Sequence, residues 1–173
     1  MRGVCAATSA AHQRGLLHRD LKPENIFLCR SGGEEAAKIL DFGLVKQLPG
    51  FGKEQSDSLA TTAGVLVGTL KYMAPEQLRG GRPAPGWDLW ALAIVAYEML
   101  VGAYPFALPR EMADLIGPRA LEPVCRQVAG APAAWQEFFE NALSPDPAKR
   151  PISAQALLEG FRRAVGEEAA LRA

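Results

Sequence analysis

The stretch His18–Asn25, which reads HRDLKPEN, constrains this chain more than any other part of its sequence. It places a carboxylate, an ammonium group and a side-chain amide at Asp20, Lys22 and Asn25, and such a set can act together on a phosphate group. The carboxylate can accept a proton from an attacking hydroxyl, the ammonium group can hold positive charge against a migrating phosphoryl group, and the amide oxygen can bind a hard cation such as Mg²⁺. Pro23 fixes its own φ angle and lacks an N–H donor, so we expect a rigid loop here and not the middle of a helix.

Composition limits the classes of protein that need to be considered. The chain has 173 residues, of which 49% are hydrophobic, so it can bury one good core and one domain is expected. Lys+Arg and Asp+Glu both number 19, and this balance argues against a nucleic-acid or membrane-surface protein. The three cysteines are widely separated, which favours free thiols in a reducing cytoplasm. The longest apolar stretch, Leu89–Val101, is too short to span a bilayer, so we expect no membrane segment.

Three further motifs follow HRDLKPEN in a fixed order. They are Asp41-Phe42-Gly43, Ala74-Pro75-Glu76, and the run Leu143–Pro151, which fits the pattern L-x-x-D-P-x-x-R-P. Together the four motifs strongly resemble the C-terminal lobe of a eukaryotic-type serine/threonine protein kinase. The overall amino-acid composition of the chain favours a bacterial member of this family. A capped surface turn alone would explain the first motif, but it would not explain the three motifs that follow in order.

The resemblance implies a mainly α fold, the large lobe of an α+β protein-kinase-like domain. In it a helical bundle surrounds a buried central helix, beside a small β-hairpin and a long activation segment. Trp87–Val101 is apolar on nearly every face and predicts the central helix, after a turn marked by Pro83, Pro85 and Gly86. The runs Ile26–Cys29 and Ala37–Leu40 predict the hairpin. Other helices are expected over about 2–14, 110–117, 133–143 and 152–165. Residues 1–165 are expected to form the truncated catalytic domain and residues 166–173 a tail.

The resemblance also implies a reaction, the transfer of the γ-phosphoryl group of ATP to a protein Ser or Thr with Mg²⁺. In this reaction Asp20 would take the hydroxyl proton, Lys22 would neutralise the transferring group, and Thr69 would hydrogen-bond this pair. A lysine at position 22 is typical of Ser/Thr-directed kinases. Asn25 and Asp41 would hold the metal ions. Contacts with the cofactor are implied for Lys22, Glu24, Asn25, Phe27 and Asp41, with Phe27 as an apolar floor under the adenine ring, or as core, or both.

Supporting roles are implied for six residues, namely His18, Arg19, Phe42, Glu76, Asp88 and Arg150. Asp88 would tie down the backbone of the catalytic loop. Arg150 would form a buried ion pair with Glu76 at the end of the activation segment. His18 is expected to be a packed core histidine that supports Phe42, and not an acid–base group.

Arg19 precedes the catalytic aspartate, so a phosphate on the activation segment could pair with it. Thr61 and Thr62 are the candidate phosphosites, and the alternative is that both are plain solvated loop residues. One position departs from the family pattern, because the family usually reads D-x-W-S-L-G where this chain carries Ala93 as the last residue. The extra methyl group is expected to cause a small adjustment in packing and no loss of fold.

Only residues 1–17 precede His18, and they contain neither a Gly-rich loop nor the lysine that grips the α- and β-phosphates. We therefore expect the chain to lack the N-terminal lobe, to need that lobe or a partner over the exposed cleft, and to bind ATP·Mg²⁺ weakly and transfer phosphate slowly. The alternative is a non-catalytic binding or regulatory module. A small-molecule phosphotransferase of related fold is disfavoured, because closure of the activation segment by Glu76 and Arg150 is a protein-kinase feature.

Overall fold

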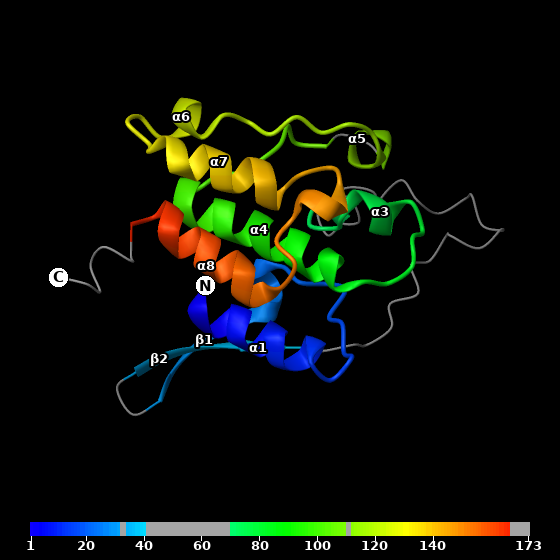
Figure 1. Ribbon diagram of the computed structural model, residues 1–173, viewed down its shortest axis with the longest axis vertical. Helices are drawn as coiled ribbons and strands as arrows, with labels where there is room; N and C mark the ends of the chain where they lie inside the picture. The colour runs from blue at the N-terminus through cyan, green and yellow to red at the C-terminus, as the bar shows by residue number, and fades with distance from the viewer. Residues whose placement is uncertain (32–33, 41–69, 110–111, 167–173) are drawn as a thin grey trace.

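The computed structural model describes residues 1–31, 34–40, 70–109 and 112–166, and helices dominate it (Figure 1). The elements are α1 (Arg2–His12), η1 (Pro23–Asn25), β1 (Ile26–Ser31), β2 (Glu34–Ile39), α3 (Pro75–Leu78), α4 (Pro85–Val101), α5 (Met112–Ile116), α6 (Val124–Gln127), α7 (Ala133–Ala142), η2 (Pro147–Lys149) and α8 (Ala154–Ala164). The expected mainly helical fold with one small antiparallel sheet is therefore present in the described part of the chain.

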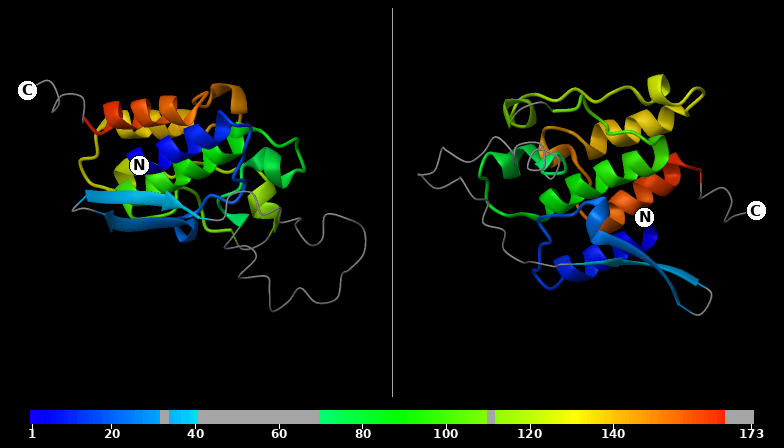
Figure 2. Two further views of the ribbon diagram at one scale, coloured as in Figure 1. Left: turned by 90° about the horizontal axis from the view of Figure 1, so that it is seen from below. Right: turned by 180° about the vertical axis from the view of Figure 1, so that it is seen from behind.

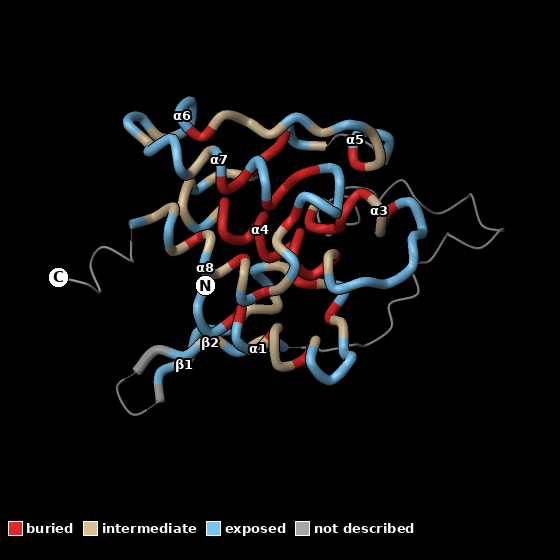
Figure 3. The backbone as a smooth tube through the Cα atoms, in the orientation of Figure 1, coloured by how far each residue is buried: buried red, intermediate tan, exposed pale blue. Residues whose placement is uncertain are grey.

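Helix α4 is the centre of the molecule. Every residue from Trp87 to Tyr97 is buried, and the burial colouring places most of the buried backbone along this helix and the segments around it (Figure 3). The helix begins at Pro85, two residues earlier than the sequence predicted, because proline suits the first turn of a helix, where its missing N–H has no intrahelical partner. It ends at Gly102, whose φ of 78° is the left-handed conformation that glycine adopts without strain.

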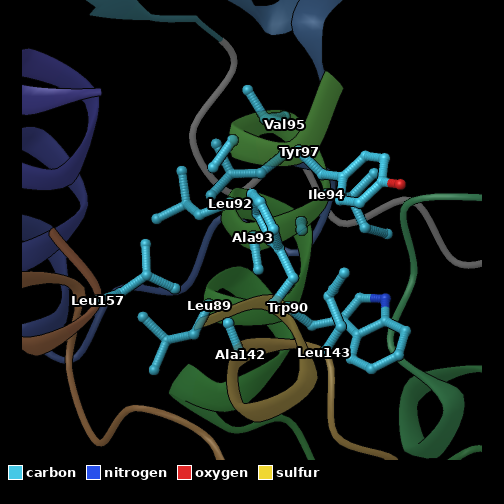
Figure 4. Packing of buried hydrophobic residues seen from close by; sticks show 14 of the residues in the cluster. Leu89, Trp90, Leu92, Ala93, Ile94, Val95, Tyr97, Ala142, Leu143 and Leu157 are labelled. Carbon is cyan, nitrogen blue, oxygen red and sulfur yellow. The ribbon is translucent and has the colours of Figure 1, made fainter. Parts of the chain in front are cut away.

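Three helices enclose this central one. Helices α7 and α8 pack against α4, and α1 packs against both α4 and α8, so apolar side chains from different elements converge around α4 (Figure 4). The ring of Tyr97 meets that of Phe139 edge-on at 4.8 Å between centroids. Ala93 is fully buried in this cluster and the fold accommodates its methyl group. At the contact of α7 with α8, a Cβ atom on Gly160 would lie only 3.2 Å from the Phe138 ring, so glycine permits the close approach.

The two strands form a hairpin that lies against α1 (Figure 2). Their antiparallel register pairs Ile26 with Ile39 and extends to Ser31 and Glu34, so both strands are longer than the sequence predicted, although Leu40 lies outside β2. Gly3 lets the hairpin approach α1, since a Cβ atom there would be 3.3 Å from that of Ala37.

Several short elements were not predicted. HRDLKPEN contains the one-turn 3-10 helix η1 where a loop was expected, because Pro23 can occupy the first position of such a turn. Helix α3 starts in the same way at Pro75. The predicted helix over 110–117 is present as α5, which ends at Ile116, and residues 110–111 lie outside the described part of the chain. Helix α8 begins after Ser153, whose hydroxyl accepts a hydrogen bond from the N–H of Ala156.

The buried thiol of Cys5 predicts a pH dependence of stability. Burial raises the pKa of Cys5 from 9.0 to about 11 in the folded chain. Between these values the unfolded state loses the proton while the folded state keeps it, so the free energy of unfolding is intact below pH 9 and falls as the pH rises to about 11. The expected loss is about 2 to 3 kcal/mol at 1.36 kcal/mol per pKa unit.

Urea unfolding at several alkaline pH values measures this loss. Cys5→Ala should remove most of this part of the pH dependence, whereas Cys125→Ala, at an exposed thiol, should keep it. If the free energy of unfolding fell equally steeply with pH in Cys5→Ala and Cys125→Ala, the assignment of this pH dependence to Cys5 would be contradicted.

Candidate active site

The structure brings Asp20, Lys22 and Asn25 together at the start of β1. The Nζ atom of Lys22 lies 3.4 Å from Oδ2 of Asp20, and Nδ2 of Asn25 donates to the Asp20 carbonyl oxygen at 2.7 Å and to Oδ2 at 3.3 Å. The side chains of Asp20 and Lys22 keep 22% and 12% of their accessible surface, so the pair is partly open to a reactant. A carboxylate and an ammonium group are thus held side by side.

The orientation of the Asn25 amide fits the binding of a cation. Both hydrogen bonds to Asp20 are made by Nδ2, since a carbonyl oxygen can only accept. The amide oxygen Oδ1 is the end that can bind a hard cation, so the donor chemistry at Asn25 suits Mg²⁺. Among the residues that the structure describes, no group of three or more His, Cys, Asp or Glu side chains is placed to hold a metal ion.

The backbone of the loop is fixed by the carboxylate of Asp88, which is only 1% exposed. Its two oxygens accept hydrogen bonds from the backbone N–H groups of His18 at 2.9 Å and Arg19 at 2.8 Å. Arg19 has a φ of 66°, an uncommon conformation for a residue other than glycine, and the carboxylate helps to hold it there. The expected contact between Asp88 and the backbone of the HRDLKPEN loop is present.

A residue that sequence reasoning missed completes this anchor. Nε2 of His12, in the last turn of α1, lies 2.8 Å from Oδ2 of Asp88. The two residues are 76 positions apart, and a single histidine at the end of an Ala-rich helix carries no local signal of this contact. We expect His12 to orient the carboxylate that holds the loop.

Replacing Asp88 by Asn should destabilise the chain by about 1 to 3 kcal/mol, the penalty for one buried donor left without an acceptor. The amide keeps the shape of the carboxylate but can accept at one end only, so the N–H of His18 or that of Arg19 loses its partner. Urea unfolding measures the change against Asp146→Asn, a surface position where Asn caps a helix as well as Asp does. An unchanged unfolding midpoint for the Asp88 variant would contradict the anchoring role.

His18 connects the loop to the end of the hairpin. It is 3% exposed, its Nδ1 accepts from the N–H of Asp20 at 3.3 Å, and its Nε2 therefore carries the proton and donates to the Leu40 carbonyl oxygen at 2.8 Å. The N–H of Leu40 donates to the Asn25 carbonyl oxygen at 2.9 Å. The residue that immediately precedes Asp41 is thus held against Asn25.

Glu76 and Arg150 form the expected ion pair. Nη1 and Nη2 of Arg150 donate to the two carboxylate oxygens of Glu76 at 2.7 and 3.0 Å. The Arg150 guanidinium also donates to the Ser144 carbonyl oxygen at 2.8 Å and lies 4.6 Å from the ring centroid of Trp90. The pair joins the start of α3 to the segment before α8.

The remaining predicted site residues divide into two groups. Glu24 is exposed in η1, and Phe27 is 60% exposed on β1, so Phe27 belongs to a surface and not to the core of the described residues. The other predictions fall outside the described residues, and these are Asp41, Phe42, Thr61, Thr62 and Thr69.

The model of the protein kinase domain family matches residues 1–161 of this chain, so the chain belongs to that family. It is 39% identical to the serine/threonine-protein kinase Pkn1 of Myxococcus xanthus over 94% of this chain, and 36% identical to pkn3 of the same organism over 88%. It is 33% identical to PknL of Mycobacterium tuberculosis over 99% of this chain. The matches span 22%, 28% and 41% of Pkn1, pkn3 and PknL respectively, so this chain corresponds to less than half of each relative.

Proposed function

We propose that this chain is the large lobe of a serine/threonine protein kinase and carries the residues that transfer the γ-phosphoryl group of ATP to a protein Ser or Thr. The observation that carries the proposal is the convergence of Asp20, Lys22 and Asn25. The bonds of Leu40 to His18 and Asn25 hold the end of the hairpin beside these three residues. Family membership supports the same activity.

Each residue has one task in the reaction. Asp20 orients the substrate hydroxyl and accepts its proton, and Lys22 faces the transferring group with positive charge. Asn25 and Asp41 would hold Mg²⁺, and Glu24 and Phe27 would contribute to the cofactor site. ATP·Mg²⁺ supplies the phosphoryl group and the charge that neutralises the phosphates. The protein otherwise positions the reactants, and the anchor at Asp88 fixes the loop before the substrate arrives.

Four exposed apolar side chains support a second element over the site. Leu16, Phe27, Leu28 and Leu40 are 55%, 60%, 73% and 42% exposed, and they lie on the loop after α1, on β1 and directly after β2. Phe27 and Leu28 are neighbours on β1 and so lie on opposite faces of the hairpin, and large exposed apolar residues indicate contact surfaces. We infer that an N-terminal kinase lobe, or a partner protein, covers them.

The same four exposed residues favour a second candidate, a non-catalytic module that binds another protein. None of the helices in the described part of the chain has the length and apolar character needed to cross a membrane. The free thiols of Cys5, Cys29 and Cys125 support a cytoplasmic location for either candidate.

Titration of the chain with ATP·Mg²⁺ tests the proposal, with Asp41→Ala as the matched variant. We expect saturable but weak binding to the unmodified chain and a clear loss of affinity in the variant. Slow transfer of labelled phosphate to a Ser/Thr protein should accompany the binding. Indistinguishable titrations for the two chains would reject the catalytic proposal and favour the binding module.

A further inference from the structure

Both backbone polar atoms of Arg19 are bonded by side chains from other elements. Oδ1 of Asp88, on α4, accepts from the Arg19 N–H at 2.8 Å. Nε2 of Gln77, on α3, donates to the Arg19 carbonyl oxygen at 2.9 Å. The contact with Asp88 anchors the start of the loop, whereas Gln77 contacts the peptide group that leads directly into Asp20.

The peptide group between Arg19 and Asp20 is held at both of its polar atoms. Its carbonyl oxygen accepts from Gln77, and its N–H, which belongs to Asp20, donates to Nδ1 of His18 at 3.3 Å. A trans peptide group is planar and carries these two atoms on opposite sides, so the two bonds together fix how the group is rotated. The Cα atom of Asp20 lies in this plane, and the direction of its carboxylate depends on that rotation.

Arg19 needs this restraint because its φ of 66° is a conformation that residues other than glycine adopt rarely. A return to the common negative range of φ would turn the peptide group that follows and move Asp20. Strained backbone of this kind persists where the surrounding contacts hold it, and it is concentrated at functional sites. The bond from Gln77 is one of the contacts that hold it.

Helix α3 offers a fixed base for the Gln77 side chain. The preceding residue, Glu76, forms the two-bond ion pair with Arg150, and the next residue, Leu78, is fully buried. Gln77 also lines the same small cavity as Asp20. A side chain that projects from so restrained a helix can fix the loop that it contacts.

We propose that Gln77 is a positioning residue for phosphoryl transfer, whose amide holds the Arg19–Asp20 peptide group so that the Asp20 carboxylate faces the substrate hydroxyl. The inference rests on the proposed kinase function for the reaction, and Gln77 acts through Asp20 without touching a reactant. Because α3 contains the end of the predicted activation segment, the bond makes the placement of Asp20 depend on where that end lies.

Gln77→Met keeps the length of the side chain and removes its donor. We expect the single-turnover rate of phosphoryl transfer to fall about 3- to 10-fold, the factor that corresponds to one ordinary hydrogen bond, while affinity for ATP·Mg²⁺ stays within about twofold. Gln77→Lys, which restores a donor of similar reach, should recover most of the rate. Gln155→Met is the matched control, at an exposed glutamine whose amide donates to Glu159 on the same helix, and should leave the rate unchanged. Equal rates for the two Met variants would overturn the proposal.

A double-mutant cycle separates positioning from a general effect on folding. If Gln77 acts through the carboxylate of Asp20, Gln77→Met should slow the Asp20→Asn chain by less than about twofold, because the group that it positions is already absent. A role in stability alone would slow the chain by the same factor with either residue at position 20. Equal factors in the two backgrounds would therefore overturn the positioning role.

The contact is also tested without phosphoryl transfer. In Gln77→Met the ¹³C signal of the Arg19 carbonyl should shift, because the bond to its oxygen is lost, and the Asp20 amide should exchange with solvent about 3- to 10-fold faster. Gln155→Met should change neither signal.

These two NMR signals keep the positioning role distinct from the kinase proposal. If no chain transferred phosphate, the kinase proposal would fail, while a response of both signals would still support the positioning of Asp20 and its absence would overturn it. If transfer occurred and neither signal responded to Gln77→Met, the positioning role would fail and the kinase proposal would stand.

Discussion

Replacing Asp20 by Asn is expected to slow phosphoryl transfer by a factor of about 10²–10⁴, the usual contribution of a positioned proton acceptor. The amide has the shape of the carboxylate but cannot accept the hydroxyl proton. Affinity for ATP·Mg²⁺ should stay within about twofold, because the predicted metal ligands Asn25 and Asp41 are unchanged. Single-turnover transfer from labelled ATP, with the chain in excess, measures the rate even when turnover is slow.

Asp20→Asn should change the free energy of unfolding only slightly, so a slower transfer rate would reflect lost catalysis and not lost folding. The ion pair between Asp20 and Lys22 is partly exposed, with an Nζ–Oδ2 distance of 3.4 Å, so it contributes about 0 to 1 kcal/mol. Asp146→Asn is the matched control and should leave the transfer rate unchanged. If Asp20→Asn transferred phosphate as fast as Asp146→Asn, Asp20 would not be the proton acceptor.

Replacing Arg150 by Ala is expected to destabilise the chain by about 3 to 5 kcal/mol, the cost of breaking a buried pair by removing one partner. The side chain of Arg150 is 1% exposed, and its loss also removes the bond to the Ser144 carbonyl oxygen and the contact with the Trp90 ring. Urea unfolding measures the loss. Lys149→Ala, the neighbouring exposed residue, should change stability far less.

Replacing Glu76 should destabilise the chain less than replacing Arg150. The Glu76 side chain is 27% exposed, so water can replace part of its contact, and Glu76→Gln keeps one oxygen that accepts from the guanidinium. We expect Glu76→Gln to cost about 1 to 2 kcal/mol. A double-mutant cycle isolates the coupling between the two side chains. A loss for Arg150→Ala no larger than that for Lys149→Ala would contradict the buried pair.

The parts of the site that depend on neighbouring residues in the sequence could be predicted. Asp20, Lys22 and Asn25 lie within six positions, and proline restricts the loop between them, so spacing alone indicated that they meet. The all-round apolar pattern of residues 87–101 predicted the buried helix, because no polar face is available to solvent.

The parts that depend on long-range packing could not be predicted from residues alone. His12 meets Asp88, and Lys71 meets Glu98 and Tyr104, across separations of 76, 27 and 33 positions, and no local pattern marks any of these contacts. The resemblance to kinases supplied the pair of Glu76 with Arg150 and the role of Asp88, which composition and periodicity did not. The roles of Asp41, Thr61, Thr62 and Thr69 stay predictions, because these residues lie outside the described part of the chain.

The anchoring of His18 and Arg19 by Asp88, about 70 positions later, has a consequence for biosynthesis. The loop leaves the ribosome well before α4, and its backbone donors have no acceptor until that helix has been made and packed. Contacts between such distant parts of a chain form late, after local helices. A nascent chain interrupted before residue 88 therefore lacks the carboxylate that helps to hold Arg19 in its left-handed conformation, and the HRDLKPEN loop reaches its final shape only with the finished core.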